Sequence, residues 1–541
     1  MEPDPHRWRA LSVCLVAGFM TLLDVSIVNV ALPSIRTGLR ATDSDLQWVL
    51  SGYALTFGLV LVPSGRFGDA YGRRLGFMAG LAAFTVASAA AGLSPGPGWL
   101  VVARLVQGAS AGLLTPQIAG LIQQLFTGAE RGRAFGLLGA SIGVSTAVGP
   151  LLGGLIISAA GAASGWRWIF YVNVPVGIAA LPLAHRLVPI GPARHRRPSL
   201  DPVGVVLLGS GVFLLLLPLV EYRQWTGRSK WWLFAGAVVA LAGFVGWERR
   251  YRAGGGEPVA DLGLFRVRSY SLGSTLALLY FAGFTSIFFT FTLFLQIGLG
   301  YSALLAGAAV TPFALGSAAA SGLGGRSVSR FGRHLVAVGL LLVLAGLAGV
   351  EVAVHQAGGH GVALATAVPL LVAGVGSGLV IAPNQTITLS EVPVRGAGSA
   401  AGVLQTGQRI GTAVGIATVG SLFFATVTSS HGDFARAFDD SLSIVIAFVV
   451  AALAAAVADL AASRWGLAPA ARRDQPAGST AVPAWASPTR TVTGNGGSPG
   501  AGSSPAPESG CQSWMGTTPG SATSPQTRSR PATSSAVLTT A

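Results

Sequence analysis

Long apolar runs, separated by short polar segments, follow one another along most of the chain. Each run can cross a bilayer as a helix, because a hydrocarbon core of about 30 Å requires about 20 apolar residues. Fourteen runs occur in a pattern of six, two and six: 11–32, 46–64, 75–93, 99–126, 134–158, 168–187, 203–220, 231–247, 271–296, 303–322, 335–354, 362–389, 397–426 and 441–462. The pattern predicts an all-α polytopic membrane protein with fourteen transmembrane helices.

Composition and charge agree with this interpretation. The 541 residues are 51% hydrophobic and 10% charged, whereas soluble domains carry about 25% charged residues. The net charge of +15 comes from short arginine clusters between the runs, which argues against nucleic-acid binding. These clusters follow even-numbered spans, so the positive-inside rule predicts a protein of the cytoplasmic membrane with both termini cytoplasmic.

Two segments of the chain repeat each other. Residues 65–74, after span two, begin Gly-Arg and end Gly-Arg-Arg, and residues 325–334, after span ten, begin Gly-Arg and end Gly-Arg-His. Two homologous halves around a midplane cavity are typical of alternating-access transporters. We expect four regions: an N-terminal six-helix bundle (1–190), a cytoplasmic linker with two inserted helices (191–268), a C-terminal six-helix bundle (269–463) and a disordered cytoplasmic tail (464–541).

The first apolar run contains one carboxylate, Asp24. A charge in the middle of a bilayer costs at least about 2.5 kcal/mol, so it normally faces a bundle interior or a wet cavity and serves function. Burial favours the neutral form of a carboxylate, whereas water or a nearby arginine favours the charged form. Asp24 is therefore a candidate proton site, and the alternative is a hydrogen-bonded carboxylate that only stabilises packing.

The first copy of the repeat contains a charged turn with the spacing Gly-x-x-x-Asp-x-x-Gly-Arg-Arg: Gly65, Asp69, Gly72, Arg73 and Arg74. A tight glycine turn can hold Asp69 where it pairs with an arginine and with a helix N-terminus. These residues are candidates for a latch that holds one conformation, although such a turn could also be a topological anchor. The second copy has Ser329 in place of the acid, and we expect only the N-terminal latch to be charged.

Spans four and five carry two more patterns. In span four, Arg104 lies three residues before Gln107. A guanidinium does not deprotonate, so Arg104 can only tune a carboxylate, hold a polar network or pack against backbone carbonyls. Span five has small residues in register with a proline, a pattern that allows close helix approach and a kink: Gly143, Gly149, Pro150, Gly153 and Gly154.

Together these motifs resemble the major facilitator superfamily, and within it the fourteen-span drug:proton antiporter branch. The resemblance covers about residues 11–462, with departures at Ala70, where the family often has a basic residue, and at Ser145, where the span-five motif has glycine. It implies a major facilitator fold, proton coupling through Asp24 and Arg104, and a role of the span-five motif in export. It further implies an antibiotic resistance or export protein of a high-GC antibiotic-producing bacterium.

Several polar residues within the spans are candidates for a substrate path, and hydrogen bonds between helices are the equal alternative: Asn29, Gln107, Asn384, Gln405, Gln408 and Arg409. We expect proton-coupled efflux of a hydrophobic antibiotic that confers self-resistance, with an aromatic polyketide as one substrate class. The alternatives are an exporter of another metabolite such as a siderophore, and a non-transporting membrane sensor or enzyme. The chain lacks nucleotide-loop, metal-spacing and nucleophile-elbow motifs, so we expect no enzyme, cofactor or metal. The expected partners are a small molecule, protons and lipid, and the expected state is a monomer.

Overall fold

A computed structural model describes residues 5–161, 164–190, 201–220, 230–357 and 359–464 of the chain. Within these residues the structure is almost entirely helical and has no strand. Fourteen helical segments there are long and apolar enough to cross a membrane, which confirms the predicted number. Residues 191–200 and 465–541, which include most of the expected tail, lie outside the described residues.

The N-terminal half contains six spans, because α6 and α7 together form one, and the inserted pair follows it. These helices are α1 (Arg7–Leu39), α2 (Asp43–Tyr71), α3 (Arg73–Gly92), α4 (Pro97–Leu125), α5 (Gly128–Ala160), α6 (Gly165–Tyr171), α7 (Asn173–Leu187), α8 (Pro202–Val220) and α9 (Lys230–Ala253). The remaining elements are η1 (Leu262–Arg266), α10 (Arg268–Leu293), η2 (Phe294–Gly298), α11 (Ala303–Phe331), α12 (Arg333–Gln356), η3 (Gly359–Gly361), α13 (Val362–Ala365), α14 (Ala367–Thr388), η4 (Val394–Gly396), α15 (Ala397–Ser429) and α16 (Phe434–Arg464).

Local sequence explains where several helices begin and end. Thr42 and Asp45 form a capping box at the start of α2, in which each side chain accepts a hydrogen bond from the other residue's backbone N–H. The Ser302 side chain caps α11 by accepting from Leu305 N. Gly72 has a φ of 103°, which suits glycine and lets the chain turn sharply between α2 and α3.

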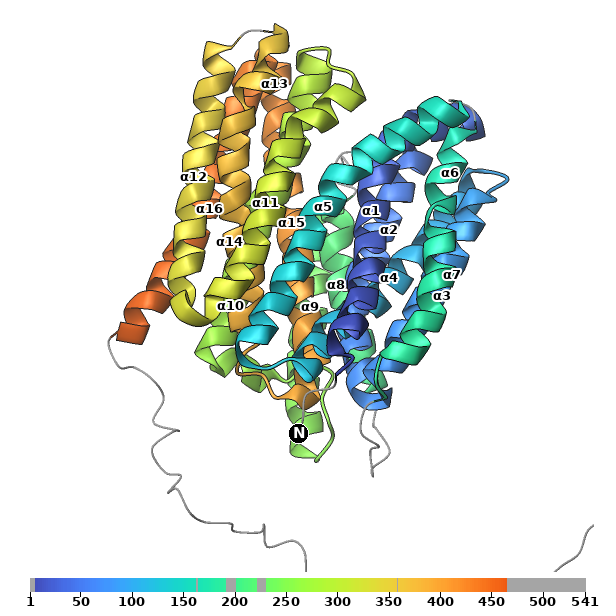
Figure 1. Cartoon of the computed structure of the whole chain (residues 1–541), viewed down its shortest axis with the longest axis vertical. Helices are drawn as coiled ribbons and strands as arrows, with labels where there is room; N and C mark the ends of the chain where they lie inside the picture. The colour runs from blue at the N-terminus through green and yellow to red at the C-terminus, as the bar shows by residue number, and fades with distance from the viewer. Residues whose placement is uncertain (1–4, 162–163, 191–200, 221–229, 358, 465–541) are drawn as a thin grey trace, which may run out of the picture. The chain divides into compact units, whose positions relative to one another are not determined.

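Two helical bundles stand side by side in Figure 1, with the N-terminal half in blue to teal and the C-terminal half in yellow-green to orange. Fully buried aromatic rings fill both bundles: Phe77, Phe84 and Phe135 in the first, and Phe291, Phe423 and Phe438 in the second. Lipid tails are as apolar as these side chains, so close packing rather than escape from water holds spans together in a membrane.

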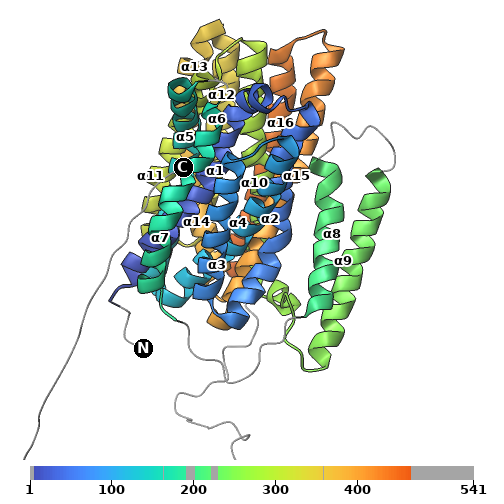
Figure 2. The ribbon, with the colours of Figure 1, turned by 90° about the vertical axis from the view of Figure 1, so that its right-hand side faces the viewer.

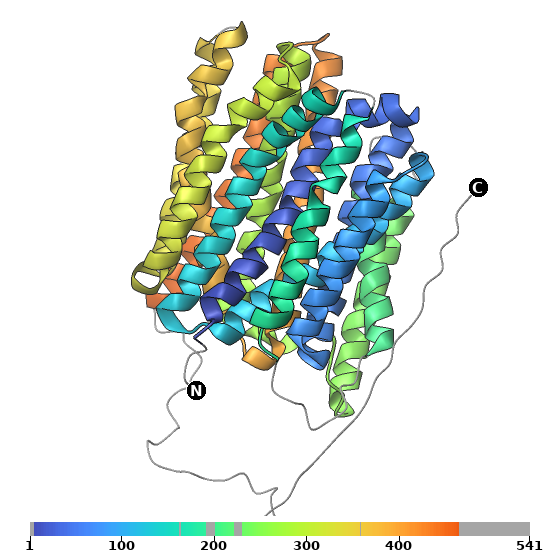
Figure 3. The same cartoon turned by 45° about the vertical axis from the view of Figure 1, so that its right-hand side comes forward.

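The bundles meet mainly along two helix pairs, α5 with α11 and α2 with α15, and Figures 1 and 3 show α5 beside α11. By the sequence repeat, α2 corresponds to α11, so the two contacts are equivalent positions of the two halves. The inserted helices α8 and α9 pack together, and α8 contacts α2 and α15 on one side of the bundles (Figure 2). We call the end of the bundles where α3, α5, α10 and α12 begin the arginine-rich end, after Arg73, Arg131, Arg268 and Arg333.

Candidate functional site

Asp24 lies inside the N-terminal bundle, and its side chain has no exposed surface. Its Oδ2 atom lies 2.5 Å from Arg104 Nη1, in α4. Its Oδ1 atom accepts hydrogen bonds from Gln107 Nε2 at 2.9 Å and from Asn173 Nδ2 at 3.1 Å. Because Arg104 and Gln107 are three residues apart, they lie on the same face of α4 and reach the carboxylate together.

A second layer of contacts fixes these donors. Ser88 Oγ, in α3, accepts from Gln107 Nε2 at 3.2 Å and from Asn173 Nδ2 at 3.1 Å, and it donates to Phe170 O in α6 at 2.9 Å. Arg104 Nε donates to Val49 O at 3.0 Å, and its guanidinium lies over the ring of Tyr53 at 4.2 Å. We call Asp24 and its surroundings the carboxylate cluster: Asp24, Tyr53, Ser88, Arg104, Gln107 and Asn173.

The hydrogen bonds of the cluster offset the cost of burying the Asp24–Arg104 charge pair. Removing one partner of such a pair leaves an uncompensated charge, which typically costs several kcal/mol. Arg104 bonds to the carboxylate, to Gln107 Oε1 at 2.8 Å and to a backbone carbonyl. The arrangement places the Asp24 carboxylate and the Arg104 guanidinium in direct contact inside the bundle.

Asp69 joins the two bundles at the arginine-rich end. Its Oδ1 accepts from Gly398 N at 3.1 Å, and its Oδ2 accepts from Ser399 N at 2.8 Å, both in the first turn of α15. A carboxylate at a helix N-terminus is favourable because unpaired N–H groups and the helix dipole face it. Arg73 Nη2 pairs with Asp69 Oδ1 at 3.0 Å. A Cβ placed on Gly65 would lie 2.2 Å from Gly398 O, so glycine is needed for this approach.

Arg73 and Arg74, which also belong to the expected latch, make further contacts outside Asp69. Arg73 also donates to Gly120 O at 2.7 Å and to Val394 O, so it links α3 to α4 and to the opposite bundle. Arg74 donates to His185 O in α7 of its own bundle and does not meet Asp69. The sequence reasoning missed Gln123, whose Nε2 donates to Leu389 O at 2.7 Å across the bundles.

The second copy of the repeat, which has Ser329 in place of the acid, is paired with an acid from elsewhere in the chain. Arg333 forms an ion pair with Asp459 from α16. Arg268 Nη2 approaches Asp459 Oδ1 at 2.9 Å. The acid therefore comes from the last span instead of from the repeat itself, and this ion-pair cluster stays within the C-terminal bundle.

The glycines of α5 face two different helices. A Cβ on Gly143 would lie 2.9 Å from Ala314 O of α11, in the opposite bundle. A Cβ on Gly149 would lie 2.4 Å from Ser26 Cβ, and one on Gly153 would lie 2.9 Å from Ile27 Cγ1, both in α1. Pro150 touches Gly307 of α11, whereas a Cβ on Gly154 would meet only Leu304 at an ordinary 3.5 Å. The motif thus connects α11 to the helix that carries Asp24.

The remaining candidates for a substrate path differ in burial and in hydrogen bonding. Asn384 is buried and donates to Gly273 O at 3.0 Å, which joins α14 to α10. Asn29 is exposed and donates to Val25 O within its own helix at 3.2 Å. Gln405 and Arg409 lie one turn apart in α15, where Gln405 Oε1 is buried without a hydrogen-bond partner. Gln408 lies between them in the sequence and is partly buried.

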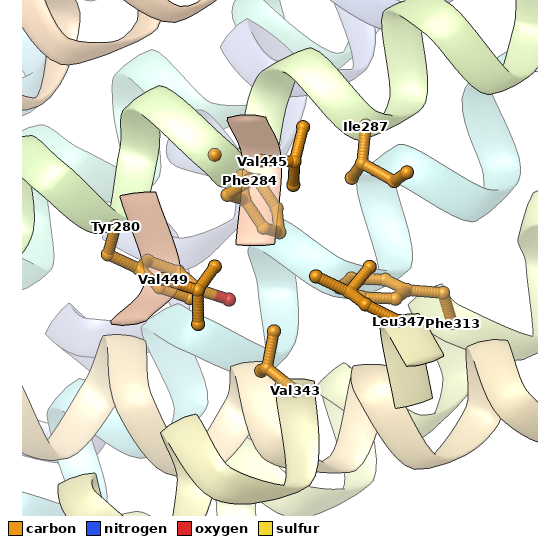
Figure 4. A pocket seen from close by; sticks show the side chains of 9 residues that line it. Tyr280, Phe284, Ile287, Phe313, Val343, Leu347, Val445 and Val449 are labelled. Carbon is orange, nitrogen blue, oxygen red and sulfur yellow. The ribbon is translucent and has the colours of Figure 1, made fainter. Parts of the chain in front are cut away.

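A small apolar pocket lies inside the C-terminal bundle and away from these groups (Figure 4). Its cavity of about 10 Å³ is far smaller than ordinary ligand pockets, which measure about 300 to 1,000 Å³. Nine residues line it: Tyr280, Gly283, Phe284, Ile287, Phe313, Val343, Leu347, Val445 and Val449. With almost no polar surface, it is a packing defect of one bundle rather than part of the carboxylate cluster.

Two six-helix bundles, an inserted helix pair and a charge pair buried within a span define a multi-pass membrane transporter of the two-bundle type. The Major Facilitator Superfamily model matches residues 14–416, and the chain belongs to this family. The chain is therefore a membrane transporter and not an enzyme.

Similar proteins come mostly from antibiotic-related transport. The probable actinorhodin transporter of Streptomyces coelicolor is 38% identical over 79% of this chain and 74% of its own length. The puromycin resistance protein pur8 of Streptomyces alboniger is 36% identical over 83% of this chain and 90% of its own length. The crystal structure of the human organic anion transporter MFSD10 has a TM-score of 0.62 over 84% of this chain and all of that chain, and its 16% identity supports likeness of fold alone.

Proposed function

We propose that this transporter uses the proton gradient to export a hydrophobic antibiotic across the cytoplasmic membrane and so confers self-resistance. The names of its relatives, an actinorhodin transporter and a puromycin resistance protein, support efflux of antibiotics. An aromatic polyketide remains one candidate substrate class. We also propose that the arginine-rich end and both termini are cytoplasmic, in keeping with the positive-inside rule.

One observation carries the proton coupling: Asp24 is a fully buried carboxylate whose charge is balanced by Arg104 at 2.5 Å. Its hydrogen-bond partners lie on α4 and α7, so tilting of these helices against α1 can lengthen the contacts. A carboxylate that loses its arginine in an apolar site favours the protonated form. Protonation would then couple to the change of conformation.

The cross-bundle hydrogen bonds suggest which conformation the structure represents. Asp69, Arg73 and Gln123 make theirs at the arginine-rich end. With that end cytoplasmic, the molecule is closed toward the cytoplasm, and the latch must open before substrate can enter. We further propose a monomer as the working unit, because both bundles and all partners of Asp24 belong to one chain.

The test is drug efflux from inverted vesicles under an imposed pH gradient, with Asp24→Asn as the variant. Asparagine keeps the volume and much of the hydrogen bonding but cannot take up or release the proton. We expect the variant to insert, with a lower melting temperature because Arg104 loses its counter-charge, and to lose gradient-driven efflux, while exchange of drug without a gradient persists.

Asp440→Asn is the matched control, because Asp440 is a partly buried carboxylate of α16 whose side chain, within the described part of the chain, bonds to the Thr426 hydroxyl at 3.0 Å and to no arginine. This control should keep wild-type efflux. If Asp24→Asn transports at the wild-type rate with the same pH dependence, the proton site lies elsewhere.

A further inference from the structure

Arg409 carries a charge within a span that no carboxylate of the described residues balances. It lies in α15, and among the described residues it makes no hydrogen bond and no ion pair. Its guanidinium lies over the ring of Phe57, 4.3 Å from the ring centre, and the side chain remains partly accessible. A cation over an aromatic ring gains about 0.5 to 2 kcal/mol, which is less than the cost of at least about 2.5 kcal/mol for a charge in mid-membrane.

The two arginines at the centre of the protein are therefore unlike. Tyr53 and Phe57 stack with centroids 6.1 Å apart, and Arg104 lies over Tyr53 while Arg409 lies over Phe57. Arg104 is neutralised by Asp24, and Arg409 has no such partner among the described side chains. Tyr53 therefore contacts an arginine that is ion-paired, whereas Phe57 contacts an arginine that no described carboxylate balances.

A second group with unused hydrogen-bonding capacity lies beside Arg409. Gln405 is four residues earlier on α15, so both side chains lie on one face of the helix. Its Oε1 atom is buried without a partner, and the described residues offer its amide no hydrogen bond. An amide and a guanidinium that are both unpaired within a membrane span indicate a place where another molecule completes the bonding.

The position also brings the two bundles together. Arg409 and Gln405 belong to the C-terminal bundle, whereas Phe57 belongs to α2 of the N-terminal bundle. Arg409 Cβ lies 3.9 Å from where a Cβ on Gly58 would stand, so α2 and α15 are in contact here. A ligand held by Arg409 and resting on Phe57 would touch both bundles and could favour one conformation over the other.

We propose that Arg409 and Gln405 form a subsite for an ionised oxygen acid, so that the exported molecule is an apolar compound carrying one carboxylate or phenolate. The inference rests on the proposed export function and deepens it by naming the charge of the substrate. The planar fork of arginine matches a carboxylate with two parallel hydrogen bonds, and the Gln405 amide can donate to the same group or accept from a neighbouring hydroxyl. Apolar contacts with Phe57 would hold the rest of the molecule.

The test measures equilibrium binding to the purified full-length protein, without any proton gradient, so its result is independent of efflux. The probes are pyrenebutyrate, an apolar aromatic acid, and pyrenebutanol, its neutral counterpart, and the readout is pyrene fluorescence anisotropy. We expect the wild type to bind the acid more tightly than the alcohol. Arg409→Gln should lower affinity for the acid by about tenfold to a hundredfold, the range expected for hydrogen bonds between charged groups, and leave the alcohol unaffected.

Arg330→Gln is the matched control, because Arg330 also lies over a phenylalanine ring, Phe331, at 5.3 Å but is exposed near the arginine-rich end. It should keep the preference for the acid, and Arg409→Lys should keep part of it. The comparison of the two probes on the wild type needs no variant, so poor folding of Arg409→Gln does not remove the test. Equal binding of the two probes, binding of neither, or an unchanged preference in Arg409→Gln would overturn the subsite, whatever the outcome for proton-driven efflux.

Discussion

At the scale of single residues, the Asp24 carboxylate has donors on both of its oxygens. The arginine occupies Oδ2, while two neutral amides, from Gln107 and Asn173, occupy Oδ1. Both neutral donors satisfy the buried Oδ1 atom, which would otherwise lack a hydrogen-bond partner. Both amides also donate to Ser88 Oγ, so the loss of one amide changes the hydrogen bonding of the hydroxyl that the other amide contacts.

Asn173→Ala is expected to destabilise the protein and to disturb transport. It removes a donor from a buried carboxylate, and hydrogen bonds to charged groups contribute about 1.5 to 3 kcal/mol. Thermal unfolding of the purified protein and the pH profile of efflux are the measurements.

Asn384→Ala serves as the control, because Asn384 is also buried but its partners among the described residues are neutral: it donates to the Gly273 carbonyl and accepts from the Thr388 hydroxyl. It should cost about 0.5 to 1.5 kcal/mol and leave the pH profile unchanged. A shift of the pH profile by Asn384→Ala, with none by Asn173→Ala, would contradict the assignment of these two asparagines.

Sequence reasoning found Asp24 and Arg104 because a charge within an apolar run is conspicuous. It did not find Ser88 or Tyr53 as members of the cluster. A serine in an alanine-rich helix usually bonds to its own backbone, and its partners depend on how each helix is rotated. That rotation is a property of packing, which the order of residues along one helix does not specify.

At the scale of elements, α5 transmits contacts between the bundles. Its glycines meet α11 at Gly143 and α1 at Gly149 and Gly153, only two to three residues past Asp24 in α1. Hydropathy predicted this helix and its length, because span number and length follow from the bilayer thickness. The break between α6 and α7, which brings Asn173 to the cluster, has no equally clear signal in the sequence.

Within the span-five motif, Gly149→Ala and Gly154→Ala should behave in opposite ways. Alanine has a higher helix propensity than glycine by up to about 1 kcal/mol, so a substitution without a clash should be neutral or stabilising. A Cβ on Gly149 would lie 2.4 Å from Ser26 Cβ, and overpacking of this kind costs about 1 to 3 kcal/mol. We expect Gly149→Ala to lower the melting temperature and slow efflux.

The Gly154→Ala protein should match or exceed the wild type in melting temperature, since its new Cβ would meet only Leu304 at 3.5 Å. The two variants are compared at equal membrane levels by thermal unfolding and drug efflux. Equal behaviour of the two would mean that contact between α5 and α1 does not decide the role of the motif.

At the scale of the whole molecule, the two equivalent contacts between bundles are not alike. Where α2 ends at α15, the Asp69 carboxylate binds the helix N-terminus. Where α11 meets α5, a Cβ on Gly132 would lie 2.4 Å from Gly325 O, and contact is made by glycine backbones. The sequence repeat predicted the equivalence of the halves, but it did not predict that Asp459 would supply the acid of the second half from a distant span.

Asp69→Asn should therefore shift the molecule away from the conformation seen here, because only one of the two contacts depends on a charge. Asparagine keeps one oxygen acceptor but loses the charge that favours a helix N-terminus, a change of about 1 to 3 kcal/mol or a fivefold to hundredfold shift in population.

Asn29 reports on the conformation, because it is exposed in this structure at a depth beyond Asp24 from the arginine-rich end. In a background that replaces Cys14 and Cys511, labelling of Asn29→Cys by a membrane-impermeant maleimide should slow when Asp69 is changed to asparagine. Ser329→Ala, the equivalent position of the second copy, should leave the labelling rate unchanged. If Asp69→Asn also leaves it unchanged in a correctly inserted protein, the carboxylate at the start of α15 does not hold the bundles in this state.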